Sequence, residues 1–177
     1  MRAVTKKFTN IKIGISTNSL PVLLFFLIFI SGCKVFSSSM PNDTLVNNEL
    51  RDSIISYAKE LLGTKYKYSG IKPKSGFDCS GFVFFIYGNY NIDLPHSSKA
   101  QSKLGIDVSI KNAKPGDLIF FKKRKSVDHV GIVVENLDNE LWVVHSTNTR
   151  GVILEDVKNS DYWQKKIFSV KDVISKN

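Results

Sequence analysis

The sequence predicts one α+β domain, with N-terminal helices packed on an antiparallel sheet of five to six strands, and three observations lead to this class. An amphipathic helical pattern comes first, then an apolar run that starts at a cysteine, and then several β-type runs separated by turn residues. Helices followed by a meander of strands indicate an α+β arrangement rather than alternating βαβ units. The part from residue 49 to residue 177 holds about 130 residues, enough for a single compact core.

The first element is a helix over "NELRDSIISYAKELLG". Asn48 is a suitable N-cap and Gly63 a suitable stop. A second, shorter helix is predicted over "SSKAQSKLG", where Ser98 and Gln101 have capping-box spacing and Gly105 follows. One face of the first helix is apolar and is expected to pack on the core; it carries Leu50, Ile54, Ala58, Leu61 and Leu62.

The run "CSGFVFFIYG" is the ambiguous element between these two helices. Its aromatic and β-branched residues have strand propensity. A helix beginning at Cys79 is nevertheless the preferred interpretation, because Asp78 is a good N-cap and a helix start stabilises a thiolate. A run that is apolar on every side also fits a helix inside the core.

The strands follow the turn "KPGD". Five short runs are rich in β-branched and aromatic residues, and turn residues separate them: "LIFF", "VGIVVEN", "LWVVHST", "GVILEDV" and "KIFSVKDVI". These runs predict the antiparallel sheet.

Residues 1–32 resemble the signal peptide of a bacterial lipoprotein. A basic opening precedes the apolar run "LPVLLFFLIFI", which is shorter than the roughly 20 residues that a membrane-spanning helix needs. The tetrapeptide Ile30-Ser31-Gly32-Cys33 resembles a lipobox, which implies cleavage before Cys33 and lipid attachment to its thiol. An ordinary signal peptide with a chance cysteine is the alternative. Polar residues 33–48 would then be a tether, and residues 49–177 the domain.

The charge balance points away from nucleic acid. The formal net charge is +9, and four basic residues precede Cys33, which leaves +5 on the mature chain. An exported protein of this charge meets anionic wall polymer or lipid head groups rather than nucleic acid, although a solvated lysine-rich surface explains the excess equally well. We expect a monomer without a metal or other cofactor, held at the outer or periplasmic face of a membrane.

Cys79 has no partner for an intramolecular disulfide once Cys33 carries lipid. An unpaired thiol in an exported protein indicates a reactive group or an intermolecular link, and a buried inert cysteine is the third possibility. The flanking residues of "FDCSGF" are small or polar, which indicates an approachable thiol.

Two of the three histidines lie in adjacent predicted strands. An odd hairpin loop, for example residues 136–138, would set His129 directly opposite His145, with their Cβ atoms about 5 Å apart. An even loop would put them on opposite faces unless a bulge intervened. A thiol beside two imidazoles suggests a nucleophile, a base and a group that orients the base. Zinc binding is a weaker alternative, because local ligand spacing is missing.

Six segments resemble, in order, the motifs of the NlpC-type peptidases, papain-like enzymes that cut the stem peptides of bacterial peptidoglycan. They are "GTKYKYSG", "GFDCSGFV", "LPHSSKAQ", "KPGDLIFF", "DHVGIVV" and "VHSTNTRGV". The resemblance implies three catalytic positions, with Cys79 as nucleophile, His129 as general base and acid, and His145 as the residue that orients His129. It also implies substrate contacts by Tyr66, Asp78 and Ser80.

The chain departs from the family pattern in two places, where Ser69-Gly70 replaces a common Gly-Gly pair and His96-Ser97 replaces Arg-Thr. Lysines at 72 and 74 and the run "KKRK" at 122–125 would attract stem carboxylates, or are simply solvated. The expected function is hydrolysis of an amide bond in the stem, either between D-glutamate and the diamino acid or at the cross-link. An amidase or acyl transferase, and a non-catalytic wall-binding module, are the alternatives.

Overall fold

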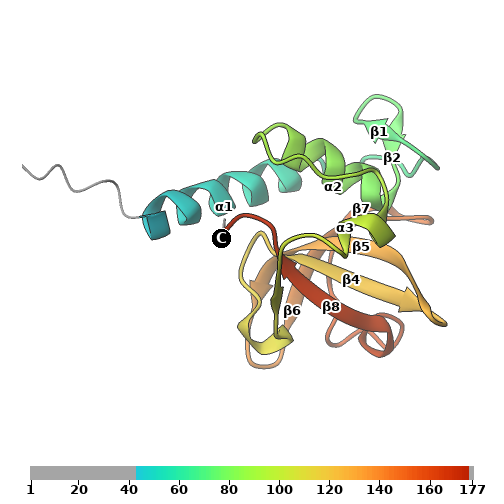
Figure 1. Cartoon of the computed structure of the whole chain (residues 1–177). Coiled ribbons are helices and arrows are strands. Elements are labelled where there is room, and N and C mark those ends of the chain that lie inside the picture. The colour runs from blue at the N-terminus through green and yellow to red at the C-terminus, as the bar shows by residue number, and fades with distance from the viewer. Residues whose placement is uncertain (1–42, 176–177) are drawn as a thin grey trace, which may run out of the picture. The chain divides into compact units, whose positions relative to one another are not determined.

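The computed structural model describes residues 43–175 (Figure 1). The predicted signal peptide, Cys33 and most of the predicted tether lie outside these residues. Within residues 43–175, no helix combines the length and the apolar character needed to cross a bilayer.

Helix α1 spans Asp43–Glu60, so it begins before the predicted start at Glu49. Asn48 therefore lies inside the helix and does not cap it. The helix tolerates this residue, because an internal asparagine costs only about 0.5 kcal/mol. The last six residues of the predicted tether belong to this helix. Gly63 ends the following turn at φ +82°, as predicted, and its N–H donates to the carbonyl oxygen of Val152 at 2.9 Å.

Helix α2 spans Cys79–Gly88, which confirms the helical interpretation of the ambiguous run. Asp78 is its N-cap, and the carboxylate accepts a hydrogen bond from the N–H of Gly81 at 2.7 Å. The helix is buried on most of its surface, including Phe82 and Ile86, so tertiary packing outweighs the strand propensity of its residues.

Helix α3 is a single turn, Ser98–Gln101, and Ser97 rather than Ser98 caps it. The side chain of Gln101 donates to the carbonyl oxygens of Ser80 and Pro95 at 3.1 and 2.8 Å. The predicted capping box does not form, because the helix starts one residue earlier, with the Ser97 side chain accepting from the N–H of Ala100.

The main sheet has six antiparallel strands in the order β3-β8-β4-β5-β6-β7. Five of them confirm the predicted runs, and β3 was not predicted. A small hairpin, β1 with β2, precedes α2. The bounds are β1 Ile71–Lys72, β2 Gly76–Phe77, β3 Ile106–Val108, β4 Leu118–Lys123, β5 Ser126–Asn136, β6 Leu141–Thr147, β7 Gly151–Asp156 and β8 Ile167–Asp172, with 3-10 turns at Ile110–Asn112 and Gln164–Lys166.

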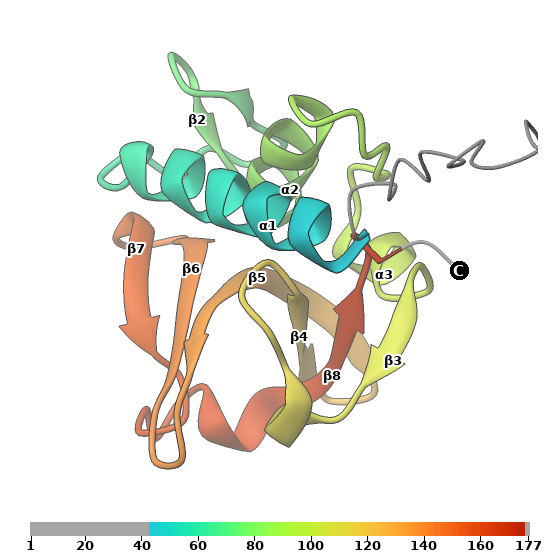
Figure 2. The same ribbon diagram turned by 90° about the vertical axis from the view of Figure 1, so that its left-hand side faces the viewer.

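The sheet curves beneath α1 and α2 (Figure 2). Each of its faces buries a separate core. The helical side packs α1 and α2 against residues such as Phe120 and Val144. The other side gathers Phe121, Val143 and Trp163. The second core matters for function, because the two strand histidines lie beside it.

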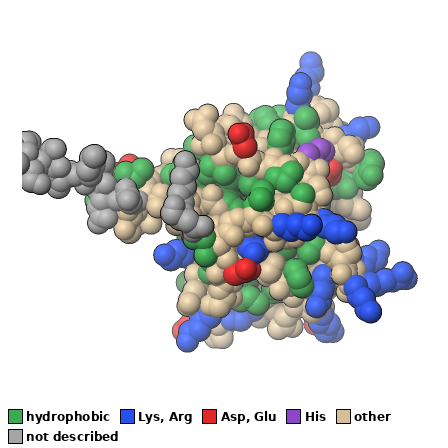
Figure 3. All heavy atoms as spheres, in the orientation of Figure 1, with side chains coloured by type: hydrophobic (Ala, Val, Ile, Leu, Met, Phe, Trp, Pro, Cys, Tyr) green, Lys and Arg blue, Asp and Glu red, His purple; other side chains and the backbone are tan. Residues whose placement is uncertain are grey.

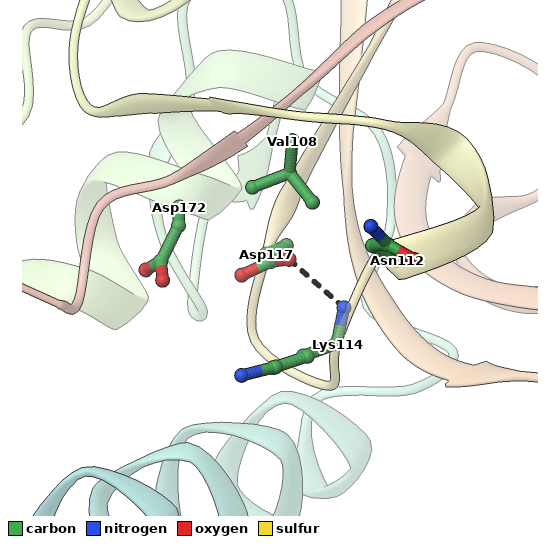
Figure 4. Close-up of a pocket in the computed structure, with 5 residues that line it drawn as sticks. All are labelled: Val108, Asn112, Lys114, Asp117 and Asp172. Atoms are coloured by element: carbon green, nitrogen blue, oxygen red, sulfur yellow. Dashed lines mark hydrogen bonds between the residues drawn. The ribbon is translucent and has the colours of Figure 1, made fainter. Parts of the chain in front are cut away.

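A buried ion cluster joins the first helix to the end of the chain. The Arg51 guanidinium donates to Asp117 at 2.7 Å and pairs with Asp172 at 2.7 Å. The Asp117 carboxylate also accepts the N–H of Lys114 at 2.8 Å, in a hollow of about 490 Å³ (Figure 4). Arg51 is only 4% exposed, so it fastens α1, the "KPGD" turn and the end of β8 to one another.

Candidate active site

Cys79 occupies the first position of α2, where the helix meets β5. Its sulfur lies 4.0 Å from the carbonyl oxygen of Asp128, the residue before His129. Asp78, besides capping the helix, accepts the Ser80 hydroxyl at 3.0 Å. The cysteine is thus set by a capped helix on one side and by a sheet strand on the other.

The thiol form of Cys79 is favoured at rest. Burial raises the pKa of Cys79 to about 11, and the Asp78 carboxylate acts in the same direction. The backbone N–H of Val130 on β5, followed by those of Ser80 and Cys79 at the helix start, lowers the pKa, but these groups do not outweigh the loss of solvent. The helix-start N–H groups thus act in the expected direction, and the sulfur depends on a neighbouring base to lose its proton.

The two predicted strand histidines form a pair. The Nε2 atom of His129 on β5 lies 3.0 Å from the Nδ1 atom of His145 on β6. Their rings are 5.1 Å apart between centroids and meet edge to face. The expected proximity is confirmed, and it unites residues from two strands of the hairpin.

The hairpin reaches this pairing by a different register from the one predicted. Four residues, Leu137 to Glu140, separate β5 from β6, so the three-residue loop was wrong. A bulge between Val133 and Glu135 shifts the register, and Ile132 then pairs with Val144. If this register continues, Thr147 lies opposite His129, and His145 is its diagonal neighbour on the same face. The structure follows the alternative of an even loop corrected by a bulge.

Gly131 gives His145 its room on the sheet. A Cβ atom at residue 131 would lie 2.4 Å from Val143 Cγ1 and 3.1 Å from His145 Cβ. The first contact is too short for any real side chain, so the glycine of "DHVGIVV" allows β6 to approach closely.

Trp163, which the sequence analysis did not single out, covers the histidine pair. Its ring stacks on His129 with centroids 4.6 Å apart and an angle of 27°, and it lies 4.9 Å from the ring of His145. Burial lowers the pKa of His129 well below its usual value, and it lowers the pKa of His145 to about 3. Both rings are therefore neutral near pH 7. A tryptophan in a turn between strands carries no motif that would have revealed this role.

A cavity of about 620 Å³ opens onto Cys79 and His129. Tyr66 also lines it, as expected for a residue beside the nucleophile, and burial followed by the nearby Cys79 raises its pKa. The remaining lining residues are mostly polar: Lys123, Asp128, Thr147, Asn148, Thr149, Arg150, Glu155, Ser160, Tyr162, Trp163 and Lys166. This cavity shares no lining residue with the hollow beside Asp117.

Asp78 and Ser80 are not among the residues that line the cavity. Ser80 is buried, and the Asp78 carboxylate also lies 2.9 Å from Nε2 of His96. The structure places these two predicted contacts at the base of α2, where they hold the helix start. Within residues 43–175, no group of three or more His, Cys, Asp or Glu side chains is arranged to hold a metal ion.

Lys and Arg side chains gather where α3 and the ends of β4 and β5 lie (Figure 3). A groove there is lined by five cationic residues and no acidic one, and Lys123 lines both this groove and the cavity. The groove comprises Lys99, Ser102, Lys103, Lys123, Arg124, Lys125, Ser126 and Val127.

Comparison with known proteins identifies relatives of this domain. The chain is 44% identical over 110 residues to the gamma-DL-glutamyl hydrolase of Bacillus subtilis (strain 168), covering 62% of this chain and 27% of that protein. It is 32% identical over 137 residues to the murein DD-endopeptidase MepS/murein LD-carboxypeptidase of Escherichia coli (strain K12), covering 76% and 70%. The chain thus spans only about a quarter of the first relative's length.

The fold has solved counterparts as well. The crystal structure of an NlpC/P60 family protein from Bacillus cereus ATCC 10987 matches with a TM-score of 0.64 and 30% identity, covering 71% of this chain and 40% of that one. The model of the NlpC/P60 family matches residues 63–172, which include all the residues described around Cys79 and the histidine pair. The chain belongs to the NlpC/P60 family of papain-like cysteine peptidases.

Proposed function

We propose that this protein hydrolyses an amide bond in peptidoglycan stem peptides through a thioester on Cys79. The observation that carries the proposal is the convergence of three groups. Cys79 and His129 line one cavity, and the second nitrogen of His129 is engaged by His145 at 3.0 Å. A nucleophile, a base and a group that orients the base is the arrangement that covalent acyl transfer needs.

The mechanism follows from which imidazole nitrogens are engaged. Nε2 of His129 is used toward His145, so Nδ1 is the nitrogen left for the thiol. Cys79 sulfur attacks the substrate carbonyl carbon while its proton passes to this Nδ1. The C–N bond then breaks as His129 returns the proton to the departing amine. Water, deprotonated by the same nitrogen, attacks the thioester, and the C–S bond breaks to give a carboxylic acid and the free thiol.

The pKa shifts of Cys79 and His129 both favour the neutral form of the group, and this fits the order of events. A thiol with a raised pKa and an imidazole with a lowered one do not form a stable ion pair at rest. The proton moves as the sulfur attacks, when substrate has displaced water and donors stabilise the developing oxyanion. The N–H of Cys79, at the free start of α2, is one such donor.

Within the stem, we place the cut at the γ-D-glutamyl bond to the diamino acid. A glutamate that is linked through its γ-carbonyl keeps its α-carboxylate free. Lys123 and Lys166, which line the cavity, could bind this carboxylate while the γ-amide bond is cut. The relative with 44% identity is named a gamma-DL-glutamyl hydrolase, which favours this bond over the cross-link. Tyr66 would contact the substrate, and Asp78 and Ser80 would act through the start of α2.

The proposed location is the cell envelope, with lipid on Cys33 as the anchor. Support for the anchor comes from the lipobox-like "ISGC" and its apolar leader. Cys33→Ser should abolish incorporation of labelled palmitate and release the protein from the membrane fraction. Unchanged labelling in that variant would refute the anchor.

The function is tested by incubating the purified protein with peptidoglycan and identifying the products by mass spectrometry. Fragments with new D-glutamate and diamino-acid ends are expected, and Cys79→Ala should produce none. Cross-link cleavage instead would correct the bond, and conjugates that require an added amine would indicate an acyl transferase. Wall binding that persists in Cys79→Ala, together with no turnover by the wild type, would indicate a binding module.

A further inference from the structure

One buried polar atom of the histidine pair has no hydrogen-bond partner. The Nε2 atom of His145 is enclosed in the protein, and the residue is 0% exposed. A carboxylate oxygen, Oε2 of Glu155, lies 3.4 Å from it, but the two atoms do not form a hydrogen bond in this structure. A buried imidazole N–H without a partner is costly, so this near contact calls for a function.

Glu155 reaches this position from the neighbouring strand. On β6 and β7, Val143 pairs with Glu155 and His145 pairs with Ile153. Glu155 is therefore the diagonal neighbour of His145 on the same face of the sheet, within reach of a long side chain. The sheet register, rather than a flexible loop, brings the carboxylate to the ring.

Two further donors hold the same oxygen. Arg150 Nη2 donates to Glu155 Oε2 at 2.7 Å, and Trp163 Nε1 donates to it at 3.1 Å. The same Trp163 ring stacks on His129. The carboxylate is thereby fixed in place, and through Trp163 it is connected to both histidines of the pair.

We propose that Glu155 is a positioning residue that accepts the Nε2–H of His145 and so sets the tautomer of both rings. With its proton on Nε2, His145 presents an unprotonated Nδ1 that accepts from Nε2–H of His129. His129 then has no proton on Nδ1, the nitrogen required as base. This inference rests on the roles given to Cys79 and His129 in the proposed function.

The opposite tautomer would disable the site. A proton on Nδ1 of His145 would point at Nε2 of His129, which would have to become the acceptor. The proton of neutral His129 would then sit on Nδ1, and that nitrogen would have no lone pair free to accept the thiol proton. The charged groups facing the pair are Glu155 and Arg150 beside His145 and Lys166 beside His129. The two cations oppose an imidazolium there, so both rings are neutral in the resting protein and the tautomer decides which nitrogen can act as base. The 3.4 Å contact is expected to shorten when substrate fills the cavity, because catalytic hydrogen bonds are often long in the free enzyme.

The test replaces Glu155 with Gln, which keeps the shape but whose NH₂ group can donate to His145 and favour the wrong tautomer. Glu140→Gln is the matched control, since Glu140 also accepts an indole N–H, from Trp142 at 2.7 Å, but does not line the cavity. For Glu155→Gln, kcat should fall by at least about tenfold, as is common when an outer hydrogen-bond partner of an active-site ring is lost, with KM changed less than about twofold. Glu140→Gln should retain wild-type values.

A second measurement reads the tautomer directly. Imidazole ¹⁵N shifts in the full-length protein labelled at histidine should place the His145 proton on Nε2 in the wild type and in Glu140→Gln. Glu155→Gln should shift part of the population to Nδ1. Glu155→Asp, which keeps the charge on a shorter arm, should preserve the wild-type tautomer and so serves if the Gln variant does not fold.

The possible outcomes separate this inference from the proposed function. Unchanged kcat in folded Glu155→Gln, or an unchanged tautomer in spite of lower kcat, would overturn the role of Glu155. A wild-type protein that cuts no peptidoglycan would overturn the function. The ¹⁵N spectra of the resting protein would then still decide whether Glu155 sets the tautomer.

Discussion

Acidification should destabilise the fold through His145. This ring is completely buried, and its pKa falls from about 6.5 in the unfolded chain to about 3 in the folded protein. The folded state thus binds fewer protons than the unfolded state between these values. The contribution of neutral His145 is fully present above pH 6.5 and is lost as the pH falls toward 3.

The magnitude follows from the two pKa values. Between pH 7 and pH 5, protonation of this one ring in the unfolded chain lowers the free energy of unfolding by about 2 kcal/mol. Urea unfolding at both pH values measures the loss in the wild type and in His145→Asn, and the wild type should lose about 2 kcal/mol more.

The difference between the wild type and His145→Asn isolates the contribution of His145 to the pH dependence of stability. Acidic and basic groups outside the histidine pair contribute equally to both proteins, so their pH dependence cancels in the difference. Equal losses in the wild type and His145→Asn would mean that His145 is not held neutral by burial. The reasoning about the resting state of the histidine pair would then fail.

Three further predictions concern the rest of the molecule. Arg51→Ala should lower the free energy of unfolding by about 3–5 kcal/mol in urea titrations, because it leaves the buried Asp117 carboxylate without its cation; a loss below about 1 kcal/mol would contradict the importance of the ion cluster. Gly131→Ala should cost about 1–3 kcal/mol and lower kcat, since its Cβ would displace His145; normal kcat in the folded variant would refute this. Replacing Arg124 and Lys125 with Glu should raise KM for peptidoglycan at low salt, and should change it little at high ionic strength, where charges are screened. A KM that does not depend on salt in either the wild type or the variant would exclude an electrostatic role for the groove.

The local sequence predicted which helices and strands form better than it predicted where they begin and end. The Asp78 cap and the apolar run after it were enough to assign α2, because an N-cap and burial both act within a few residues. The start of α1 and the strand β3 were missed, since neither has a strong boundary signal in the sequence. Ser69 adopts φ +54°, a left-handed conformation that glycine adopts easily, which explains why a glycine is common at this position. A serine in the sequence does not reveal that the backbone here is left-handed.

The candidate site was predictable only as far as its residue types allowed. Cys79, His129 and His145 stand out by their chemistry, and the structure brings the two histidines together. The bulge between Val133 and Glu135 that corrects their register has no signal in the local sequence pattern. Glu155 and Trp163 were missed for the same reason, because an ordinary glutamate and an ordinary tryptophan gain their roles only when β7 and the following turn meet the pair.

The contact of Arg51 with Asp172 also bears on how such a domain is joined to longer polypeptides. One guanidinium joins the entering helix to the departing strand, and neither residue of this ion pair lines the peptidase cavity. A unit closed in this way can be appended to other modules without its two flanks separating. That property suits a domain whose Bacillus subtilis relative devotes only 27% of its length to the shared part.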